Sequence, residues 1–307
     1  MSNGPIFSVV IPTYNRERLL AATVDSVLSQ SCRDFELIVV DDGSTDGTRS
    51  LLLSYGERIR TIFRSNQGAE SARRCAAEVA KGQYLVLLDH DDLLLPHALA
   101  TYARIIAELG APPLILAAML EFENDPPKLD REPAPTTIEV WQYRDLYARD
   151  RPPSSSCSQL VIKRSVVGST DALRREPTAF PFDTADILLS LGTVGPCVMV
   201  KHPITVAYRF HDSNTIRNLK FMVETAPGLI RLERQGRYPG GKSRRFSRWA
   251  YIGGVEIAWC RSALRARRFD LAARLLLISS PFVVAAIIRK LGRRFRRKLP
   301  AMRLGNR

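Results

Sequence analysis

The stretch YLVLLDHDDLLLP, residues 84–96, leads from an apolar run straight into three aspartates and a histidine. The four polar residues, 89–92, follow the apolar residues directly, and the chain then returns to leucine and proline. Carboxylates placed this close together repel one another, which raises the free energy of their charged forms. The cluster therefore predicts a compensating interaction at the end of a buried strand.

The sequence around this stretch predicts an α/β fold. Apolar runs that end in turn residues predict strands at 7–12, 35–40, 60–65 and 83–88. Helical spacing of apolar residues predicts helices at 21–31, 48–59, 68–82 and 96–110. Strands that alternate with helices are joined by right-handed crossovers and form a mainly parallel sheet. Because the strands are almost continuously apolar, helices are expected on both faces of this sheet.

Three polar clusters follow successive predicted strands, at residues 12–16 (PTYNR), 41–44 (DDGS) and 89–92 (DHDD). Any one of them could be a turn or a helix cap, since Asp, Ser and Asn are favoured there. The carboxyl ends of parallel strands meet at one edge of a sheet, and ligands of open α/β proteins bind outside that edge. The three clusters together therefore predict a binding site.

The charge of the chain is divided unevenly along its length. The chain holds 45 Lys and Arg against 31 Asp and Glu, a net charge of +14. Residues 217–307 contain 23 of the basic and 4 of the acidic residues, which leaves 22 basic and 27 acidic residues in 1–216. We expect a mildly acidic globular domain at 1–216 and a basic extension at 217–307. Such asymmetry predicts an anionic partner for the extension.

The cysteines and the N-terminus point to a reducing compartment. The five cysteines are widely spread and form no CxxC pair, so neither a zinc site nor a disulfide framework is indicated. The first 15 residues lack the basic start and long apolar run of a signal peptide. We therefore expect a cytoplasmic protein.

The motifs themselves resemble those of the inverting family 2 glycosyltransferases. The resemblance rests on VVIPTYNRERLLAATVDSVLSQSCRDFELIVVDDGSTDGT, on NQGAESARRCAAEVAKGQYLVLLDHDD and on the proline at 96. It is dense over residues 6–100, weaker over 101–216 and absent beyond about 216. It implies the Rossmann-like GT-A fold, a nucleotide-binding half at about 1–100, an acceptor-binding half at about 101–216, a sugar-nucleotide donor and a divalent metal held by a DxD motif.

A metal ion would explain the acidic cluster. The pyrophosphate of a nucleotide-sugar is negative, and Mg²⁺ or Mn²⁺ converts its repulsion with carboxylates into a bridge. The ion also stabilises the charge that builds on the departing diphosphate. The resemblance makes Asp91 a direct metal ligand and places Asp89 at the ribose or at the water molecules on the metal. His211, in a sequence that resembles the family's RxH element, is the third candidate ligand.

Other residues near these motifs receive roles by the same resemblance. Arg209 is expected to contact phosphate. Apart from the resemblance, His90, in the variable place of the motif, is expected to face solvent, and Asp92 to cap the helix that begins near residue 96. The candidate nucleotide-binding residues are Pro12, Thr13, Tyr14, Asp41, Asp42, Arg73 and Asp89. A solvated helix face remains the alternative for Arg73.

The general base is less clearly marked. A carboxylate must lie within hydrogen-bond reach of the acceptor hydroxyl, opposite the leaving group. The family usually supplies it from an acidic pair that opens a helix, whereas this chain has PFDTADILLSL at 181–191. The two candidates are Asp183 and Asp186, of which Asp186 is preferred. The other aspartate is then expected to cap the helix or to interact with its N-terminal dipole.

The aromatic residues at 138–150 suggest an acceptor site. The segment IEVWQYRDLYARD is predicted to form a short helix, from which Trp141, Tyr143 and Tyr147 could stack on an acceptor sugar. Packing in the protein core is the alternative for these three side chains.

The basic extension suggests contact with a membrane surface. Residues 275–288 are apolar or small, but the run is shorter than the roughly 20 residues that span a bilayer, and it contains Pro281. Seven Lys and Arg follow within 289–298. We expect a helix that lies in the headgroup region of the anionic inner leaflet. Packing on the catalytic domain or in a homo-oligomer is the alternative, and no signature of nucleic-acid binding accompanies the charge.

These features predict a metal-dependent inverting glycosyltransferase that resembles hexosyltransferases. The expected donor is a UDP-sugar, and the expected acceptor is a hydroxyl of a surface polysaccharide or of a lipid-linked glycan precursor. The enzyme would be peripherally bound to the cytoplasmic membrane. Two alternatives remain: transfer to polyprenyl phosphate, and a sugar-nucleotide-binding protein without turnover, which the missing acidic pair suggests.

Overall fold

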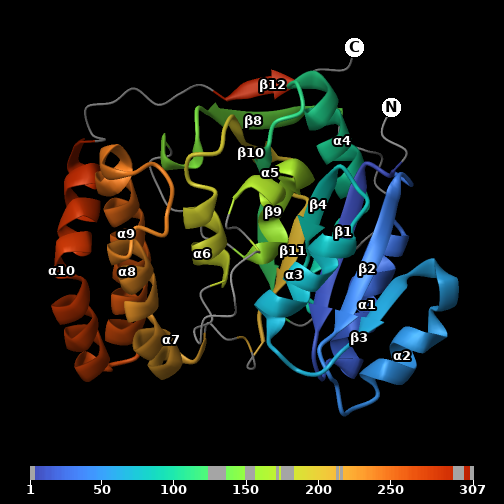
Figure 1. Ribbon diagram of the computed structural model, residues 1–307, viewed down its shortest axis with the longest axis horizontal. Helices are drawn as coiled ribbons and strands as arrows, with labels where there is room; N and C mark the ends of the chain where they lie inside the picture. Colours follow the sequence, from blue (N-terminus) through green and yellow to red (C-terminus); the bar gives the residue numbers. More distant parts are fainter. Residues whose placement is uncertain are drawn as a thin grey trace.

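A mixed sheet and a group of C-terminal helices lie side by side in the computed structural model (Figure 1). The structure describes residues 4–123, 136–148, 156–170, 173, 183–211, 214, 217–292 and 301–304. Within these residues the main sheet has nine strands in the order β12-β8-β10-β6-β9-β4-β1-β2-β3. A second sheet of three strands has the order β5-β11-β7.

The first four strands confirm the predicted parallel arrangement. They are β1 (Phe7–Thr13), β2 (Phe35–Asp41), β3 (Arg60–Phe63) and β4 (Tyr84–Leu87). Strand β1 lies between β2 and β4 and is parallel to both, and β3 is parallel to β2. The carboxyl ends of these strands therefore meet at one edge, at the bottom of Figure 1.

The remaining strands make the sheet mixed around its parallel core. They are β6 (Leu114–Leu116), β8 (Ile138–Tyr143), β9 (Leu160–Lys163), β10 (Cys197–His202) and β12 (Met302–Leu304). Strand β9 is antiparallel to both β4 and β6, and β10 is parallel to β6 and antiparallel to β8. The small sheet consists of β5 (Leu93–Leu94), β7 (Met119–Phe122) and β11 (Val206–Arg209). Strand β11 runs into the candidate ligand His211.

Helices cover both faces of the main sheet, as predicted from its apolar strands. Successive residues of β1 enter opposite cores, because side chains alternate along a strand: Val9 packs in one cluster and Val10 in the other. The helices of this part are α1 (Glu17–Leu28), α2 (Thr48–Ser54), α3 (Ala69–Val79), α4 (Ala98–Glu108), α5 (Arg164–Ser169) and α6 (Asp183–Ser190). Short 3₁₀ helices are η1 (Gly56–Arg58), η2 (Leu146–Ala148), η3 (Cys157–Gln159) and η5 (Lys242–Arg244).

The C-terminal helices form a unit, the helical unit, beside α6 (Figure 1). Its members are α7 (Leu219–Thr225), α8 (Pro227–Arg234), α9 (Arg245–Arg265) and α10 (Phe269–Gly292). Arg244 pairs with buried Asp145, and the Tyr238 hydroxyl donates to Asp186 over 2.8 Å. The chain then returns as β12, which pairs with β8 at the edge of the main sheet. The division at residue 216 stays a prediction, and the last strand joins the N-terminal part rather than the helices.

The prediction of a helix over residues 138–143 is wrong. Residues 138–143 form strand β8, because β10 and β12 supply antiparallel partners on both sides. Tyr147 is buried, and its hydroxyl donates to the carbonyl oxygen of Leu189. Trp141 lies on the sheet surface with the Lys201 ammonium above its ring. Tyr147 therefore belongs to the protein core, as the alternative interpretation stated.

Candidate functional site

The loops after β1 and β2 are hydrogen-bonded to each other. The carbonyl oxygen of Thr13 accepts the Asp42 amide over 2.9 Å, and the Asn15 amide donates to the Ser44 hydroxyl. The Asp41 carboxylate accepts both the amide and the hydroxyl of Ser44. Gly43 has a backbone φ of +84°, a value that residues with a side chain rarely adopt. Asp41 thus fixes the turn, and its predicted contact with a nucleotide stays a prediction.

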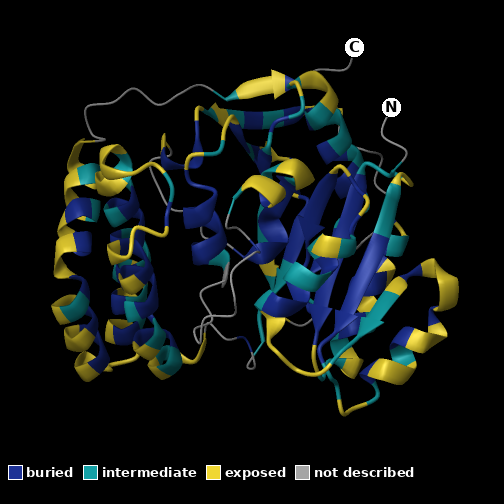
Figure 2. Ribbon diagram, viewed as in Figure 1, coloured by how far each residue is buried: buried dark blue, intermediate teal, exposed yellow. Residues whose placement is uncertain are grey.

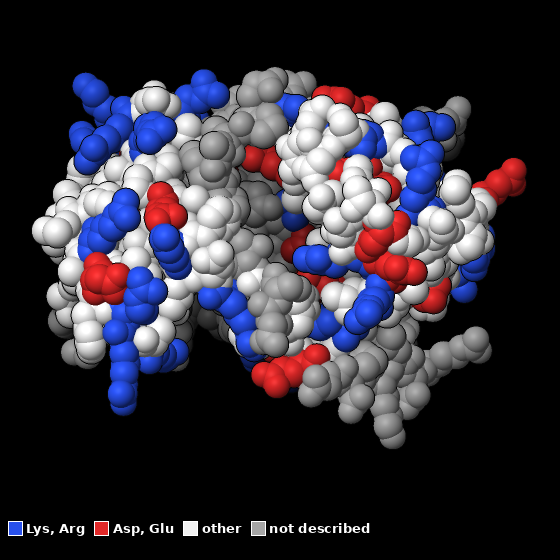
Figure 3. Space-filling model, turned by 90° about the horizontal axis from the view of Figure 1, so that it is seen from below, with Lys and Arg blue, Asp and Glu red and all other residues white. Residues whose placement is uncertain are grey.

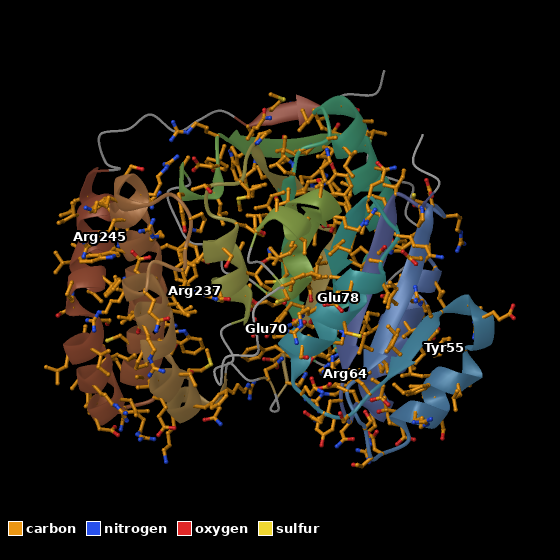
Figure 4. All side chains as sticks on the ribbon, in the orientation of Figure 1. Tyr55, Arg64, Glu70, Glu78, Arg237 and Arg245 are labelled. Atoms are coloured by element: carbon orange, nitrogen blue, oxygen red, sulfur yellow. The ribbon has the colours of Figure 1, made fainter. Side chains whose placement is uncertain are left out.

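Asp42 holds the start of the loop that leads to α3. Its buried carboxylate accepts the amides of Gln67 and Gly68, and the Arg64 guanidinium lies 3.1 Å away. Figure 4 labels Arg64 at the lower end of the sheet, near the start of α3. Asp42 is therefore positioned rigidly at the carboxyl edge, and its predicted contact with a nucleotide stays a prediction.

The first loop offers a polar atom and an aromatic ring. The Thr13 hydroxyl is buried, and no hydrogen-bond partner is found for it among the described residues. Tyr14 is 42% exposed at the same edge. A buried hydroxyl without a partner costs free energy unless a ligand or water supplies one. These two residues agree with a pocket for a base, and their roles stay predictions.

His90 does not face solvent as expected. Its Nδ1 lies 3.1 Å from the carbonyl oxygen of Pro12, so this nitrogen must donate. Its Nε2 then accepts from Arg16 Nε over 2.8 Å. Burial lowers the pKa of the imidazole. Neutral His90 therefore links the first loop to the acidic cluster.

Asp89 pairs with a buried arginine. The Arg73 guanidinium donates to one carboxylate oxygen over 2.6 Å, and the Ser156 hydroxyl donates to the other over 3.1 Å. Arg73 is 4% exposed, so the solvated helix face is excluded for it. Asp89 and Arg73, both predicted to bind the nucleotide, thus form an ion pair with each other.

Asp92 belongs to the protein interior rather than to the start of α4. Its carboxylate accepts the Ser158 hydroxyl over 2.5 Å and the Arg209 amide over 2.9 Å. Burial, together with Asp89 and Asp91, raises its pKa well above the ordinary value. Asp92 therefore holds η3 and β11 against the acidic loop, and its predicted role as a helix cap is wrong.

Asp91 and His211 meet in space although 120 residues separate them in the chain. The His211 Nε2 lies 2.9 Å from an Asp91 carboxylate oxygen. Two neighbouring ligand atoms of an octahedral Mg²⁺ or Mn²⁺, each about 2.1 Å from the ion, are about 3 Å apart. The pair therefore fits two positions of such an ion.

The protein alone supplies an incomplete metal site. Among the described residues, no group of three or more His, Cys, Asp or Glu side chains could hold a metal ion. Asp89, the other predicted ligand, is engaged with Arg73 and Ser156 instead. Magnesium is commonly held by one or two carboxylates together with substrate phosphates. The donor set fits an ion that is completed by a diphosphate.

Arg209 holds the backbone of the acidic loop, residues 89–92. Its Nε donates to the carbonyl oxygen of Asp91 over 3.1 Å, and its guanidinium lies 4.6 Å from the centre of the Phe122 ring. Its predicted contact with phosphate stays a prediction.

The two candidate bases occupy the first turns of α6. Asp183 begins the helix, and its side chain lies outside the described part of the chain. The Thr184 hydroxyl lies 3.1 Å from the Cys157 sulfur in η3. Asp186 is 6% exposed and accepts the Tyr238 hydroxyl, so it faces the helical unit. This environment weighs against Asp186 as a base, and the assignment stays a prediction.

Several residues of the site were not found from the sequence. Ser156 and Ser158 bind Asp89 and Asp92 from 64 to 69 positions away. Their only signal is the polar run SSSCSQ in front of an apolar strand. Arg64 was also missed. Figure 3 looks onto this edge and shows acidic and basic side chains in a hollow between the sheet and the helical unit.

Comparison with known proteins finds similarity to one family over part of the chain. The model described as "Glycosyl transferase family 2" matches residues 8–149, which confirms the resemblance seen in the sequence. A Rickettsia prowazekii protein, "Uncharacterized glycosyltransferase RP339", is 37% identical over 34% of this chain and 33% of its own length. Bacillus subtilis "Putative teichuronic acid biosynthesis glycosyltransferase TuaG" is 47% identical over 29% and 36%, respectively. The matched region thus spans only about a third of these relatives.

Solved structures share the fold. One of them is S. aureus TarS 1–349 in complex with UDP-GlcNAc, with a TM-score of 0.65 at 16% identity. The alignment covers 91% of this chain and 81% of the TarS chain. The mannosyltransferase PcManGT from Pyrobaculum calidifontis, in complex with GDP-Man and Mn²⁺, has a TM-score of 0.55 at 19% identity. It covers 94% of this chain and 87% of that one. The predicted GT-A fold is confirmed.

Proposed function

We propose that the chain, whose residues 8–149 match the model of glycosyltransferase family 2, transfers a sugar from a nucleotide-diphosphate donor to an acceptor hydroxyl with inversion. The observation that carries the proposal is the pairing of Asp91 with His211, 2.9 Å apart, beside the ion pair of Arg73 and Asp89. A guanidinium and two candidate metal ligands thus stand together at the carboxyl edge, which supports a site for a diphosphate.

The nucleoside would lie against the loops after β1 and β2. The Thr13 hydroxyl and the Tyr14 ring are available there, and Asp42 is held rigidly behind them. Asp89 would accept the ribose hydroxyls while its hydrogen bond from Arg73 holds the carboxylate in place. The relatives in solved structures bind UDP-GlcNAc and GDP-Man, and we propose a UDP-sugar as the donor here.

Asp91 and His211 would hold a divalent metal, Mn²⁺ or Mg²⁺, together with the diphosphate oxygens. When bound, the ion neutralises the charge that develops on the leaving diphosphate. Arg209 and Asp92 support this arrangement, because Arg209 binds the Asp91 carbonyl and Asp92 binds the Arg209 amide. The ligands are therefore held in place before a donor arrives.

The transfer would begin with the acceptor hydroxyl opposite the leaving group. Its oxygen forms a bond to the anomeric carbon while the bond from that carbon to the diphosphate oxygen breaks, and the nucleoside diphosphate leaves with the electron pair. The hydroxyl proton passes to a carboxylate. We propose Asp183 for this role ahead of Asp186, because Asp186 is buried under Tyr238. Thr184, next to Asp183, contacts η3, which also binds Asp89 and Asp92.

The acceptor is proposed to be a hydroxyl of a surface polysaccharide or of its lipid-linked precursor. The name of TuaG refers to teichuronic acid biosynthesis, which supports this class of acceptor. A cytoplasmic enzyme would meet such a precursor at the membrane surface. Transfer to polyprenyl phosphate would differ in that the lipid phosphate alone serves as the acceptor.

A transfer assay tests the proposal. The chain is incubated with a panel of UDP- and GDP-sugars, Mn²⁺, and either hydroxyl-bearing glycans or polyprenyl phosphate, and nucleoside diphosphate release and the anomeric configuration of the product are measured. The proposal predicts metal-dependent release with a glycan and an inverted product. Release only with polyprenyl phosphate would replace it by the alternative acceptor. Binding of donor without release above background would contradict enzymatic activity.

A further inference from the structure

Helix α10 presents an apolar face to solvent on the side that points away from the sheet (Figure 2). Six large apolar side chains form this face and recur at helical spacing: Leu276, Leu277, Val284, Ile287, Ile288 and Leu291. Leu277 is 82% exposed. No charged residue occurs anywhere in 275–288. We call these six residues the apolar face of α10.

The apolar face of α10 is a continuous patch rather than a set of isolated surface leucines. From Leu276 to Leu291 a helix rises about 22 Å, at about 1.5 Å per residue. Contiguous apolar patches on a protein surface commonly mark an interaction with another molecule. The opposite side of α10 contributes to the core through Leu271, Leu275 and Phe282. The helical unit therefore packs through the buried side of α10, without any contribution from the apolar face.

The helix is long and apolar enough to cross a membrane, although the predicted apolar run was too short. However, one whole side of α10 is attached to protein. A Cβ on Gly253 of α9 would come within 1.9 Å of the Phe282 carbonyl oxygen. At its C-terminal end, Arg289 donates to the Tyr147 carbonyl oxygen. A helix fixed in this way can offer lipid only its outer face.

The charges around the apolar face favour an anionic partner. Residues 219–292 contain 15 Lys and Arg against 4 Asp and Glu. Exposed Arg274 and Lys290 stand near its two ends. Figure 3 shows Lys and Arg side chains spread over the helical unit. Two copies that met at this face would bring surfaces of the same charge together, which disfavours self-association.

We propose that the apolar face of α10 docks on an anionic lipid bilayer and lies in its headgroup region, parallel to the surface. Leu277, Val284 and Ile288 would enter the boundary of the acyl chains, and Arg274 and Lys290 would contact lipid phosphates. This docking goes beyond the proposed sugar transfer and does not depend on it.

Vesicle co-sedimentation of the full chain tests this docking without any reference to activity. Vesicles of phosphatidylcholine alone are compared with vesicles that contain about one third phosphatidylglycerol. The double variant Leu277→Glu/Ile288→Glu should lower the partition coefficient on anionic vesicles about tenfold or more, because two apolar side chains leave the interface. The matched control is Leu53→Glu, which charges an exposed leucine on α2.

A second double variant separates apolar insertion from charge attraction. Leu277→Lys/Ile288→Lys adds positive charge, so a purely electrostatic attachment would strengthen, whereas the proposal predicts weaker binding. Equal sedimentation of the wild-type chain with neutral and anionic vesicles would overturn the proposal. So would a dimer in sedimentation velocity, without vesicles, that Leu277→Glu/Ile288→Glu dissolves. Circular dichroism and the melting temperature establish that the variants remain folded.

Discussion

The carboxyl edge of the sheet and the helical unit differ in whether their buried carboxylates have hydrogen-bond donors. At the edge, Asp42, Asp89 and Asp92 each accept hydrogen bonds from neighbouring residues. In the helical unit, Glu256 is 1% exposed and no hydrogen-bond partner is found for its carboxylate among the described residues. Large apolar side chains of α10 remain exposed in the same unit. The edge thus holds its carboxylates in fixed positions, as the proposed donor site requires, whereas the unit presents an extended apolar surface.

This difference predicts where charge changes affect turnover and where they affect stability. Variants at the edge should abolish reaction steps while the fold persists. Variants in the helical unit should alter the free energy of unfolding or the attachment to a surface.

The largest expected effect is at Asp91. Asp91→Asn removes the charge that would hold the metal beside His211, so transfer should fall by about 100- to 1000-fold, the usual cost of losing one stabilising group at a reaction centre. Steady-state nucleotide release measures it. Leu53→Glu on α2 is the control and should keep wild-type activity. Unchanged turnover in Asp91→Asn would contradict the role of the edge.

The next effect separates the two candidate bases. Asp183→Asn should lower kcat by about 100-fold or more, as loss of a general base does, with little change in melting temperature. Asp186→Asn should instead lower the melting temperature, because Tyr238 loses its charged partner. Measuring both kcat and the melting temperature of each variant decides which aspartate is the base. A silent Asp183→Asn together with an inactive but stable Asp186→Asn would reverse the assignment.

Glu256 makes the stability of the helical unit depend on pH. Burial raises its pKa from 4.5 to about 7, so the folded chain binds this proton more tightly than the unfolded chain. The resulting stability is fully present below pH 4.5 and is lost as the pH rises to about 7. The loss corresponds to about 3 kcal/mol at most.

Glu256→Gln should remove this pH dependence, because the amide does not titrate. Urea unfolding at pH 5 and pH 8 measures the difference in free energy of unfolding, and Glu224→Gln, an exposed glutamate on α7, is the control. A wild-type chain that is equally stable at both pH values, or a variant with the wild-type dependence, would show that Glu256 is not desolvated.

The smallest expected effect lies at the junction of the two regions. Tyr238→Phe removes the hydroxyl that donates to Asp186 and should lower the free energy of unfolding by about 1–3 kcal/mol, because a buried carboxylate loses one of its hydrogen-bond donors. Urea unfolding measures it, and kcat should change little. A large fall in kcat without loss of stability would mean that the junction acts on the reaction.

The parts of the molecule that depend on local sequence patterns could be predicted from the sequence. Strands β1 to β4 and the helices between them follow from apolar spacing. Asp91 and His211 were recognised from their motifs, and the structure brings them together. The partners of Asp89 and Asp92 were not predictable, because Ser156 and Ser158 carry no pattern that links them to carboxylates more than 60 residues away.

The misinterpretation of residues 138–143 has a physical reason, and so does the continuity of α10. Residues 138–143 form a strand because β10 and β12, which are distant in sequence, pair with them. Helix α10 continues through Pro281, where a proline usually interrupts the hydrogen bonds of a helix. Packing of Phe282 and neighbouring residues into the core favours the continuous helix despite that loss.

The most direct test of the central claim is calorimetric titration of UDP-sugars into the wild-type chain and into Asp91→Asn, each with Mn²⁺ and with a chelator. The account predicts donor binding by the wild-type chain that weakens when the metal is removed, and weak binding by Asp91→Asn under both conditions. Equal affinity of the two proteins, with no effect of the chelator, would contradict a metal-bridged diphosphate at the edge of the sheet.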